Sequence, residues 1–274
     1  MQPFLRKSIA LVPWRWRGTV KRIPLVATFQ RWLLARFLEG REFVHTVDAG
    51  PARGLKYPIT LPQDKGIWTG TYEMELAAAV ATAVRQGDVC YDVGGWRGFF
   101  GGVMALAGAE HVFLFEPLPA NVAQLRKLIS LNPELPLSLI EAAVTEQPGE
   151  LEFVVMPETS MGKLTSSSFQ SEKQSDEKIR VRAVALDALL ASGEIPPPAV
   201  IKIDVEGAEL LVLHGAQHLL ATHKPKLFME IHSPELVRAC RSLLERAGYE
   251  VQVFKQDGRE ICHFHAEPRT SWPS

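Results

Sequence analysis

The sequence lacks any run of 18 or more apolar residues, and it has no excess of charge of either sign. A helix that spans a bilayer needs about 20 apolar residues, so no transmembrane helix is expected. The 274 residues carry 30 Lys and Arg against 31 Asp and Glu. Binding to many phosphates needs a basic excess, so we do not expect nucleic acid as a partner. The composition, 46% hydrophobic and 22% charged, is that of an ordinary globular protein.

Cysteine is also scarce, with Cys90, Cys240 and Cys262 far apart and no CxxC pair. This excludes a disulfide scaffold and favours buried thiols in a reducing compartment. The N-terminal apolar stretch from Ser8 to Val12 runs into a proline and is too short for a secretory signal. We therefore expect a cytoplasmic protein.

Residues 1–41 differ from the rest of the chain because they carry nine basic residues, one acid and three tryptophans. Basic side chains interleaved with tryptophan suit peripheral contact with a membrane surface, or an acidic partner. The alternative is a helix that caps the domain, because the apolar positions of FQRWLLARFLEG fit one helical face. Short strands and turns are expected over residues 43–72. Together these segments predict a basic N-terminal extension over residues 1–71.

From residue 72 onward short apolar strands alternate with helical patterns, which is typical of an α/β fold with a mostly parallel sheet covered on both faces. Strands are expected at 89–93, 111–115, 137–141, 150–155, 179–184, 200–204, 226–231, 250–254 and 261–265. Helices are expected at 72–85, 99–107, 120–131, 186–190, 208–221 and 234–247. The last two strands suit an antiparallel hairpin at one edge. We predict one domain over residues 72–266 and a tail over 267–274.

The Ser-rich segment 156–178 interrupts this pattern and reads as a long loop. Loops of this length inside a compact domain are lids or surface segments. As a lid, Ser166, Ser167 and Ser168 would offer hydroxyl groups to a sugar-like acceptor. A plain surface loop is the alternative.

A glycine-rich turn, VCYDVGGWRGFFGG, follows the first core strand. Its candidate ligand-binding residues are Asp92, Gly94, Gly95 and Gly98. Glycines at such a bend let the backbone approach a ligand and leave helix N–H groups free. The dinucleotide pattern GxGxxG is absent, because a valine occupies the first glycine position. Glu116 ends the next strand, 18 residues after Gly98, and its carboxylate can accept both hydroxyls of a ribose. The combination predicts a ligand that contains adenosine.

Four titratable residues follow two later strands. IKIDVEGAE places Asp204 and Glu206 at the end of one strand, and KLFMEIH places Glu230 and His232 at the end of the next. The carboxyl ends of adjacent parallel strands meet at one edge, so we expect the four side chains to converge. The alternatives are a helix cap for Asp204 and a helix-dipole partner for Glu206.

The roles of these residues depend on the chemistry of the site. Asp204 is our first candidate for a general base or acceptor-orienting group, and His232 is the second. Asp204 with Glu230 or His232 could ligate Mg²⁺, although the spacing does not demand a metal. The histidine pairs elsewhere in the chain lack further ligands, so zinc is not expected.

The sequence resembles the FkbM-type S-adenosylmethionine-dependent methyltransferases over about residues 70–256. The resemblance lies in YDVGGWRG, FLFEPLPAN, EAAVTEQPGE, VRAVALDALL, IKIDVEGAELLVLHGAQHLL and KPKLFMEIH. It implies a class I methyltransferase (Rossmann-like) fold with a seven-stranded sheet. It also implies methyl transfer to an oxygen, often on a sugar, glycan or natural product.

The resemblance further implies which residues meet S-adenosylmethionine (SAM). Asp92, Gly94 and Gly98 would meet the methionine part, Glu116 the ribose, and Glu141 with Ala142 the adenine. The chain departs from the family at Gly95-Trp96, where Ala-Asn is usual, so an indole is expected to reshape the methionine pocket. The alternative function is a nucleotide-binding or membrane-surface interaction module that keeps the fold without catalysis. The acceptor and the oligomeric state are not encoded in any motif.

Overall fold

The computed structural model describes residues 40–155, 162–164, 178–257 and 261–269 of the chain. Its strands are β1 (Glu42–Thr46), β2 (Lys56–Thr60), β3 (Val89–Val93), β4 (His111–Phe115), β5 (Leu137–Ile140), β6 (Ala143–Val144), β7 (Gly149–Val155), β8 (Gly162–Leu164), β9 (Lys178–Val184), β10 (Val200–Ile203), β11 (Lys226–Ile231), β12 (Tyr249–Asp257) and β13 (Ile261–Pro268). Its helices are α4 (Lys65–Thr69), α5 (Met74–Ala83), α6 (Phe99–Leu106), α7 (Pro119–Leu131), α8 (Leu186–Ser192), α9 (Glu209–His214), α10 (Gln217–Thr222) and α11 (Pro234–Arg246).

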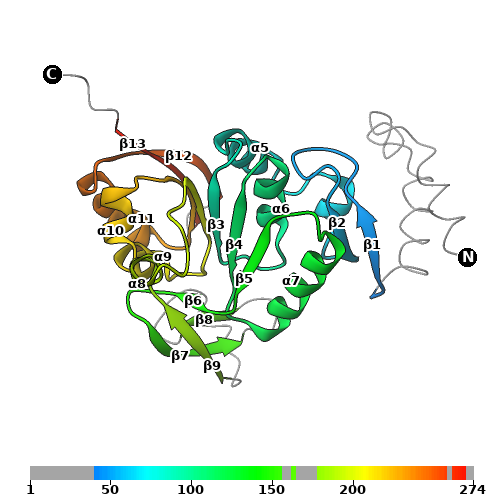
Figure 1. Cartoon of the computed structure of the whole chain (residues 1–274), viewed down its shortest axis with the longest axis horizontal. Helices are drawn as coiled ribbons and strands as arrows, with labels where there is room; N and C mark the ends of the chain where they lie inside the picture. Colours follow the sequence, from blue (N-terminus) through cyan, green and yellow to red (C-terminus); the bar gives the residue numbers. More distant parts are fainter. Residues whose placement is uncertain (1–39, 156–161, 165–177, 258–260, 270–274) are drawn as a thin grey trace, which may run out of the picture.

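A seven-stranded sheet lies at the centre of the molecule, in the order β12-β13-β11-β10-β3-β4-β5 (Figure 1). The strands from β11 to β5 are parallel, and β12 and β13 form an antiparallel hairpin beside β11. This confirms the predicted α/β class, the mostly parallel sheet and the closing hairpin. The strand order reverses between β3 and β10. Ligands of such sheets bind outside the carboxyl ends of the strands at this switch point.

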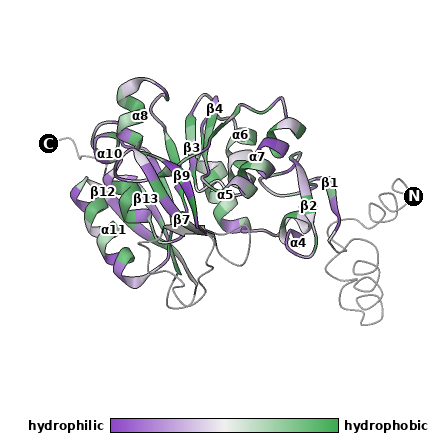
Figure 2. Cartoon of the chain, turned by 90° about the horizontal axis from the view of Figure 1, so that it is seen from below, coloured by the Kyte–Doolittle hydropathy of each residue, from purple (hydrophilic) through white to green (hydrophobic). Residues whose placement is uncertain are grey.

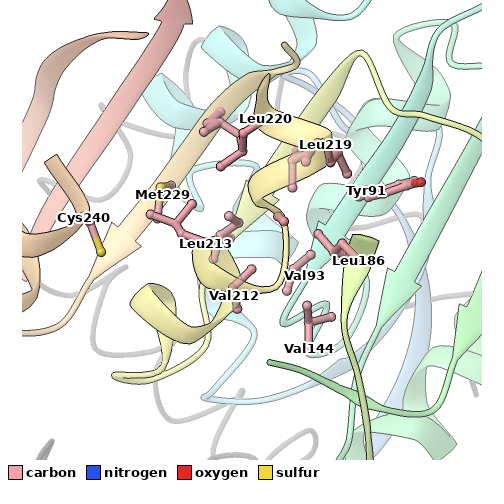
Figure 3. Close-up of a cluster of buried hydrophobic side chains, with 14 of the residues drawn as sticks. Tyr91, Val93, Val144, Leu186, Val212, Leu213, Leu219, Leu220, Met229 and Cys240 are labelled. Carbon is pink, nitrogen blue, oxygen red and sulfur yellow. The ribbon is translucent and has the colours of Figure 1, made fainter. Parts of the chain in front are cut away.

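The sheet has a hydrophobic core on each face because its side chains alternate between the two. Tyr91 and Val93 of β3 pack with Leu213, Leu219 and other residues of α8 to α11 (Figure 3). Cys90 of the same strand belongs to the other core, with residues of α5, α6 and α7. The helices around the sheet carry both hydrophobic and hydrophilic residues, as expected of elements with one face on a core (Figure 2).

The strands predicted at 150–155 and 179–184 do not join the central sheet. They are β7 and β9, which form a separate four-stranded sheet in the order β6-β9-β7-β8. β8 lies within the segment 156–178 that was predicted to be a loop throughout, so that prediction is wrong at residues 162–164. The serines proposed for a lid lie outside the described residues.

The helix predicted over residues 208–221 is two helices, α9 and α10, with a break at Gly215 and Ala216. A Cβ atom on Gly215 would lie 2.1 Å from the carbonyl oxygen of Thr145. The backbone at Gly215 therefore packs directly on the backbone after β6. This contact accompanies the break, and the local sequence pattern does not reveal it.

The segment from β1 to α4 packs into the domain core. Leu55, Tyr57 and Ile59 are fully buried in the same hydrophobic cluster as residues of α5, α6 and α7. The side chain of Asn132, after α7, accepts from the backbone N–H of Lys56 at 2.9 Å and donates to its carbonyl oxygen at 2.8 Å. Turns and short strands were expected here, and helix α4 was not. The basic segment at residues 1–39 lies outside the described residues, and so does its expected membrane contact.

The state of the cysteines and the character of the helices can be read from the structure. Cys90, Cys240 and Cys262 are buried free thiols, as expected. Among the described residues, no helix combines the length and the apolar character needed to cross a membrane.

Candidate active site

A pocket opens at the switch point, at the carboxyl ends of β3, β4, β10 and β11; we call it the switch-point pocket. Residues that follow these four strands line it. They include Gly94, Gly95 and Trp96 after β3, Glu116, Pro117 and Leu118 after β4, Asp204, Val205 and Glu206 after β10, and Glu230 near the end of β11. The pocket therefore brings the glycine turn, Glu116 and the strand-end acids together.

The glycine turn passes very close to the end of β10. Gly94 has φ +80°, and a Cβ atom there would lie 1.8 Å from the carbonyl oxygen of Asp204. The N–H groups of Gly94 and Gly95 donate to the carbonyl oxygen of Phe115 at 3.0 and 2.9 Å. Only glycine fits at residue 94, because the neighbouring atom is backbone and cannot move aside. The turn is thereby fixed against both neighbouring strand ends.

Glu116 is a buried carboxylate in the pocket wall, with 4% of its surface exposed. Its two oxygens accept from the backbone N–H groups of Trp96 and Leu118, each at 2.9 Å. The side chain of Asn121 also hydrogen-bonds to it. Burial raises the pKa of Glu116 to about 7, although these hydrogen bonds oppose the shift. These three hydrogen bonds occupy three of the roughly four acceptor sites of a carboxylate, so one site is left for a further donor.

Asp92 and Lys202 both lie close to α6; Lys202 lines the pocket, whereas Asp92 is buried beneath the glycine turn. The Asp92 carboxylate accepts from the N–H of Gly101 at 2.9 Å, and burial raises its pKa to about 6. The Lys202 Nζ lies 3.9 Å from Asp92 Oδ1 and 3.0 Å from Asp204 Oδ2, and 5.1 Å from the ring centroid of Phe100. Lys202 is thus paired with the strand-end carboxylate of Asp204.

The four titratable residues predicted to converge do lie together: the carboxylates of Asp204, Glu206 and Glu230 surround the imidazole of His232. We call these four residues the strand-end cluster. The Nε2 atom of His232 lies 3.4 Å from Glu230 Oε1, 3.5 Å from Glu206 Oε2 and 3.7 Å from Asp204 Oδ1. The histidine is buried, whereas the three carboxylates are part-exposed. The carboxylates therefore face the pocket with a buried ring between them.

The charges of His232 and Asp204 each stabilise the ionised form of the other residue. Burial alone would lower the pKa of His232, but hydrogen bonds to Glu209 and Glu230 and the charge of Asp204 raise it to about 11. Burial alone would raise the pKa of Asp204, but the charges of Lys202 and His232 hold it below its usual value. Burial raises the pKa of Glu206 to about 7. At neutral pH His232 is therefore a cation and Asp204 a carboxylate.

A further buried residue, Glu209, contacts the strand-end cluster through the Nδ1 atom of His232. It was not identified as a candidate from the sequence. Its fully buried carboxylate lies 2.7 Å from His232 Nδ1 and accepts from the N–H of Gly207 at 2.8 Å. This contact fixes one ring nitrogen and directs the other, Nε2, toward the pocket. Glu209 is the second glutamate of IKIDVEGAE. Its position in this motif is the feature of the sequence that could have identified it.

Replacing Glu209 with alanine should lower the free energy of unfolding by about 3 kcal/mol, because it leaves a charged imidazole and a backbone N–H without their buried partner. Urea denaturation followed by circular dichroism measures this. The Glu235→Gln variant, on an exposed ion pair with Arg238, should leave stability unchanged. An equal free energy of unfolding in Glu209→Ala and wild type would show that Glu209 does not stabilise the fold.

Three predicted cofactor residues lie outside the pocket wall. Gly98, with φ +83°, begins α6, and a Cβ there would meet the side chains of Leu125 and Leu128. Asp92 is buried beneath the glycine turn. Glu141 is half-exposed and pairs with Arg126, so the structure does not bring it into the pocket, whereas Ala142 lines it. Tyr72 and Glu73 also line the pocket and were not predicted.

With this geometry established, the chain can be compared with known proteins. The model of the methyltransferase FkbM domain matches residues 88–251. The chain belongs to the FkbM methyltransferase family. It is a SAM-dependent methyltransferase, as the motifs indicated, and this favours catalysis over a non-catalytic module with the same fold.

A curated relative and several solved structures, two of which are described here, are similar to this FkbM methyltransferase. The hexuronic acid methyltransferase AglP of Haloferax volcanii is 27% identical over 184 residues, which cover 67% of this chain and 72% of AglP. A crystal structure of methyltransferase FkbM from Methylobacillus flagellatus has a TM-score of 0.46 and 16% identity, over 65% of this chain and 43% of that one. M. jannaschii TYW2 in complex with AdoMet has a TM-score of 0.48 and 13% identity, over 84% and 85%.

Proposed function

We propose that this FkbM methyltransferase transfers the methyl group of SAM to a hydroxyl group of a sugar, a glycan or another small natural product. The observation that supports this is the shared pocket: Glu116, suited to a ribose diol, and Asp204, suited to accept a proton, line the same cavity. The relative from H. volcanii is named for a sugar acid, which is consistent with a sugar acceptor.

In this proposal SAM lies across the carboxyl ends of β3 and β4. The ribose hydroxyls donate to Glu116, and Ala142 borders the adenine with its neighbour Ala143. The methionine part passes over the backbone of Gly94 and Gly95, where no side chain obstructs it. Asp92 and Gly98 act indirectly, by holding the start of α6 and the turn before it.

The sulfonium methyl then faces the strand-end cluster. The acceptor oxygen attacks the methyl carbon in line, the C–S bond breaks, and its electron pair stays on sulfur to give S-adenosylhomocysteine (SAH). The hydroxyl proton passes to the carboxylate of Asp204, which Lys202 and His232 keep ionised. Because His232 is already protonated, we assign the base to Asp204 and a positioning role to His232. Glu206 and Glu230 are the remaining acceptor-facing groups.

The test is to incubate the protein with methyl-labelled SAM and fractionated extracts and to identify the molecule that gains label. A labelled product with a new C–O–CH₃ group supports the proposal. Label found only on nitrogen or carbon atoms, across all products, would contradict the O-methylation.

The pH dependence of SAH binding should follow Glu116. The carboxyl is protonated below about pH 7 and then loses acceptor capacity for the ribose, so affinity should fall as the pH falls. We expect SAH to bind about tenfold more weakly at about pH 6 than at about pH 8. Isothermal titration calorimetry measures this. In Glu116→Gln the dependence should vanish; a dependence that persists in the variant would assign it to another group.

The magnesium ion considered from the sequence would be held by Asp204, Glu230 and His232. Each offers one ligand atom, and the three atoms lie within 4.8 Å of one another. His232 would have to lose the proton on Nε2 when the ion binds. Two carboxylates and a neutral imidazole suit Mn²⁺ as well as Mg²⁺, and a bound cation would polarise the acceptor hydroxyl. We expect Mn²⁺ to bind, as followed by electron paramagnetic resonance, and Glu230→Gln to abolish the bound signal. Binding that is equal in wild type and variant would place the ion elsewhere.

A further inference from the structure

Part of one wall of the switch-point pocket comes from outside the family-matched region. Tyr72 and Glu73 line the pocket, and both precede residue 88, where the match to the family model begins. Trp96 completes this wall from the turn after β3. We call Tyr72, Glu73 and Trp96 the aromatic wall.

The two rings of this wall, Tyr72 and Trp96, are stacked on each other. The ring centroids of Tyr72 and Trp96 are 6.2 Å apart with an angle of 29° between their planes, and Tyr72 meets Phe99 edge-on at 5.0 Å. Tyr72, Glu73 and Trp96 are each part-exposed at the pocket. The wall therefore offers ring surface and a carboxylate to a ligand.

The aromatic wall is held in place by contacts with helix α4 and with the residue just before this helix. The carbonyl oxygen of Gly66 accepts from the N–H groups of Thr71 and Tyr72, at 2.8 and 3.2 Å. Asp64, just before α4, pairs with Arg97 in a buried ion pair at 2.5 Å, next to Trp96. The segment before α5 is thus attached to the glycine turn through this ion pair.

Backbone strain is concentrated around the same pocket. Within the described ranges, four residues other than glycine have positive φ, and three of them line the pocket: Glu73 at 38°, Trp96 at 46° and Glu206 at 54°. Such conformations persist only where the surroundings fix them, and they gather at binding sites. This is a reason to assign the wall to a ligand and not to packing alone.

We propose that the aromatic wall is the acceptor subsite and that it takes the ring of a neutral pyranose. This rests on the proposed function, methylation of a sugar hydroxyl in this pocket. A pyranose has one apolar C–H face, which packs on aromatic rings, and its hydroxyl groups donate to carboxylates such as Glu73 and Glu230. A carboxylate on the sugar ring would be repelled by Glu73 and by the acids of the strand-end cluster.

Saturation-transfer NMR on the SAH-bound protein tests this directly. The probes are the methyl pyranosides of glucose, galactose and mannose, with glucuronate as the charged comparison. We expect at least one neutral pyranoside to receive saturation, severalfold less in Tyr72→Leu and in Glu73→Gln. Glu75→Gln, on the exposed side of α5, is the matched control and should keep the full signal. SAH affinity should be unchanged in all three variants, and so should the thermal melts of Glu73→Gln and Glu75→Gln. Tyr72→Leu loses its ring contacts with Trp96 and Phe99, so its melting temperature should fall while the protein stays folded.

Three results would overturn the inference: no saturation of any neutral pyranoside, saturation that is unchanged in both wall variants, or a stronger signal from glucuronate. The failure of the proposed function has a different signature. If SAH itself does not bind, the cofactor placement is wrong; if SAH binds and a sugar is methylated while the wall variants keep their acceptor KM, only the acceptor subsite is wrong.

Discussion

Replacing Glu116 with glutamine is expected to weaken SAH binding by about 100-fold. A hydrogen bond to a charged group contributes about 1.5–3 kcal/mol, and Glu116 keeps one acceptor site for the ribose diol. Each 1.4 kcal/mol changes affinity about tenfold, so the loss of one strong hydrogen bond of this kind accounts for the expected effect. Glutamine keeps the size of the side chain but has one acceptor oxygen where glutamate has two.

The matched control is Glu141→Gln. Glu141 follows the next strand in the same way, but its exposed carboxylate pairs with Arg126 outside the pocket wall. Its replacement should leave SAH affinity unchanged. Calorimetry on both variants measures the difference. Equal affinity of wild type and Glu116→Gln would show that the ribose is bound elsewhere.

Replacing Asp204 with asparagine should lower kcat by about 10²–10⁴-fold, because general-base catalysis contributes about that much. The substitution keeps the shape of the side chain but cannot take the hydroxyl proton. SAH should still bind with nearly wild-type affinity, since the cofactor contacts lie on β3 and β4. Methyl-transfer kinetics, together with calorimetry, separates the two effects.

The control for this variant is Asp48→Asn, on an exposed turn outside the pocket lining. It should keep full kcat. A small loss of kcat in Asp204→Asn, with a large rise in acceptor KM, would make Asp204 a binding group only. The base would then have to be sought among Glu206 and Glu230.

The central sheet was predictable because its signals are local. The apolar strands at β3, β10 and β11 end in motifs whose residues follow each strand directly, so parallel pairing alone brings Asp204 and Glu230 together. The sheet that β7 and β9 join was not predictable, because alternation along a strand does not name its partner. β7 and β9 pair with each other although they are far apart in the sequence.

The parts of the site that sequence missed depend on contacts between distant segments. Tyr72 and Glu73 reach the pocket because the segment before α5 is tied to Arg97 through Asp64, and no local pattern encodes that pair. Glu141 shows the opposite error. β5 ends at Ile140, and the next side chain pairs with Arg126 on α7, outside the pocket.

A crystal structure of the complex with SAH is the most direct measurement of how the nucleoside is placed. We predict both ribose hydroxyls within hydrogen-bonding distance of the Glu116 carboxylate, and the sulfur atom directed toward Asp204. Ordered SAH at a different surface, with the ribose away from Glu116, would contradict the assignment of the switch-point pocket as the methyl-transfer site.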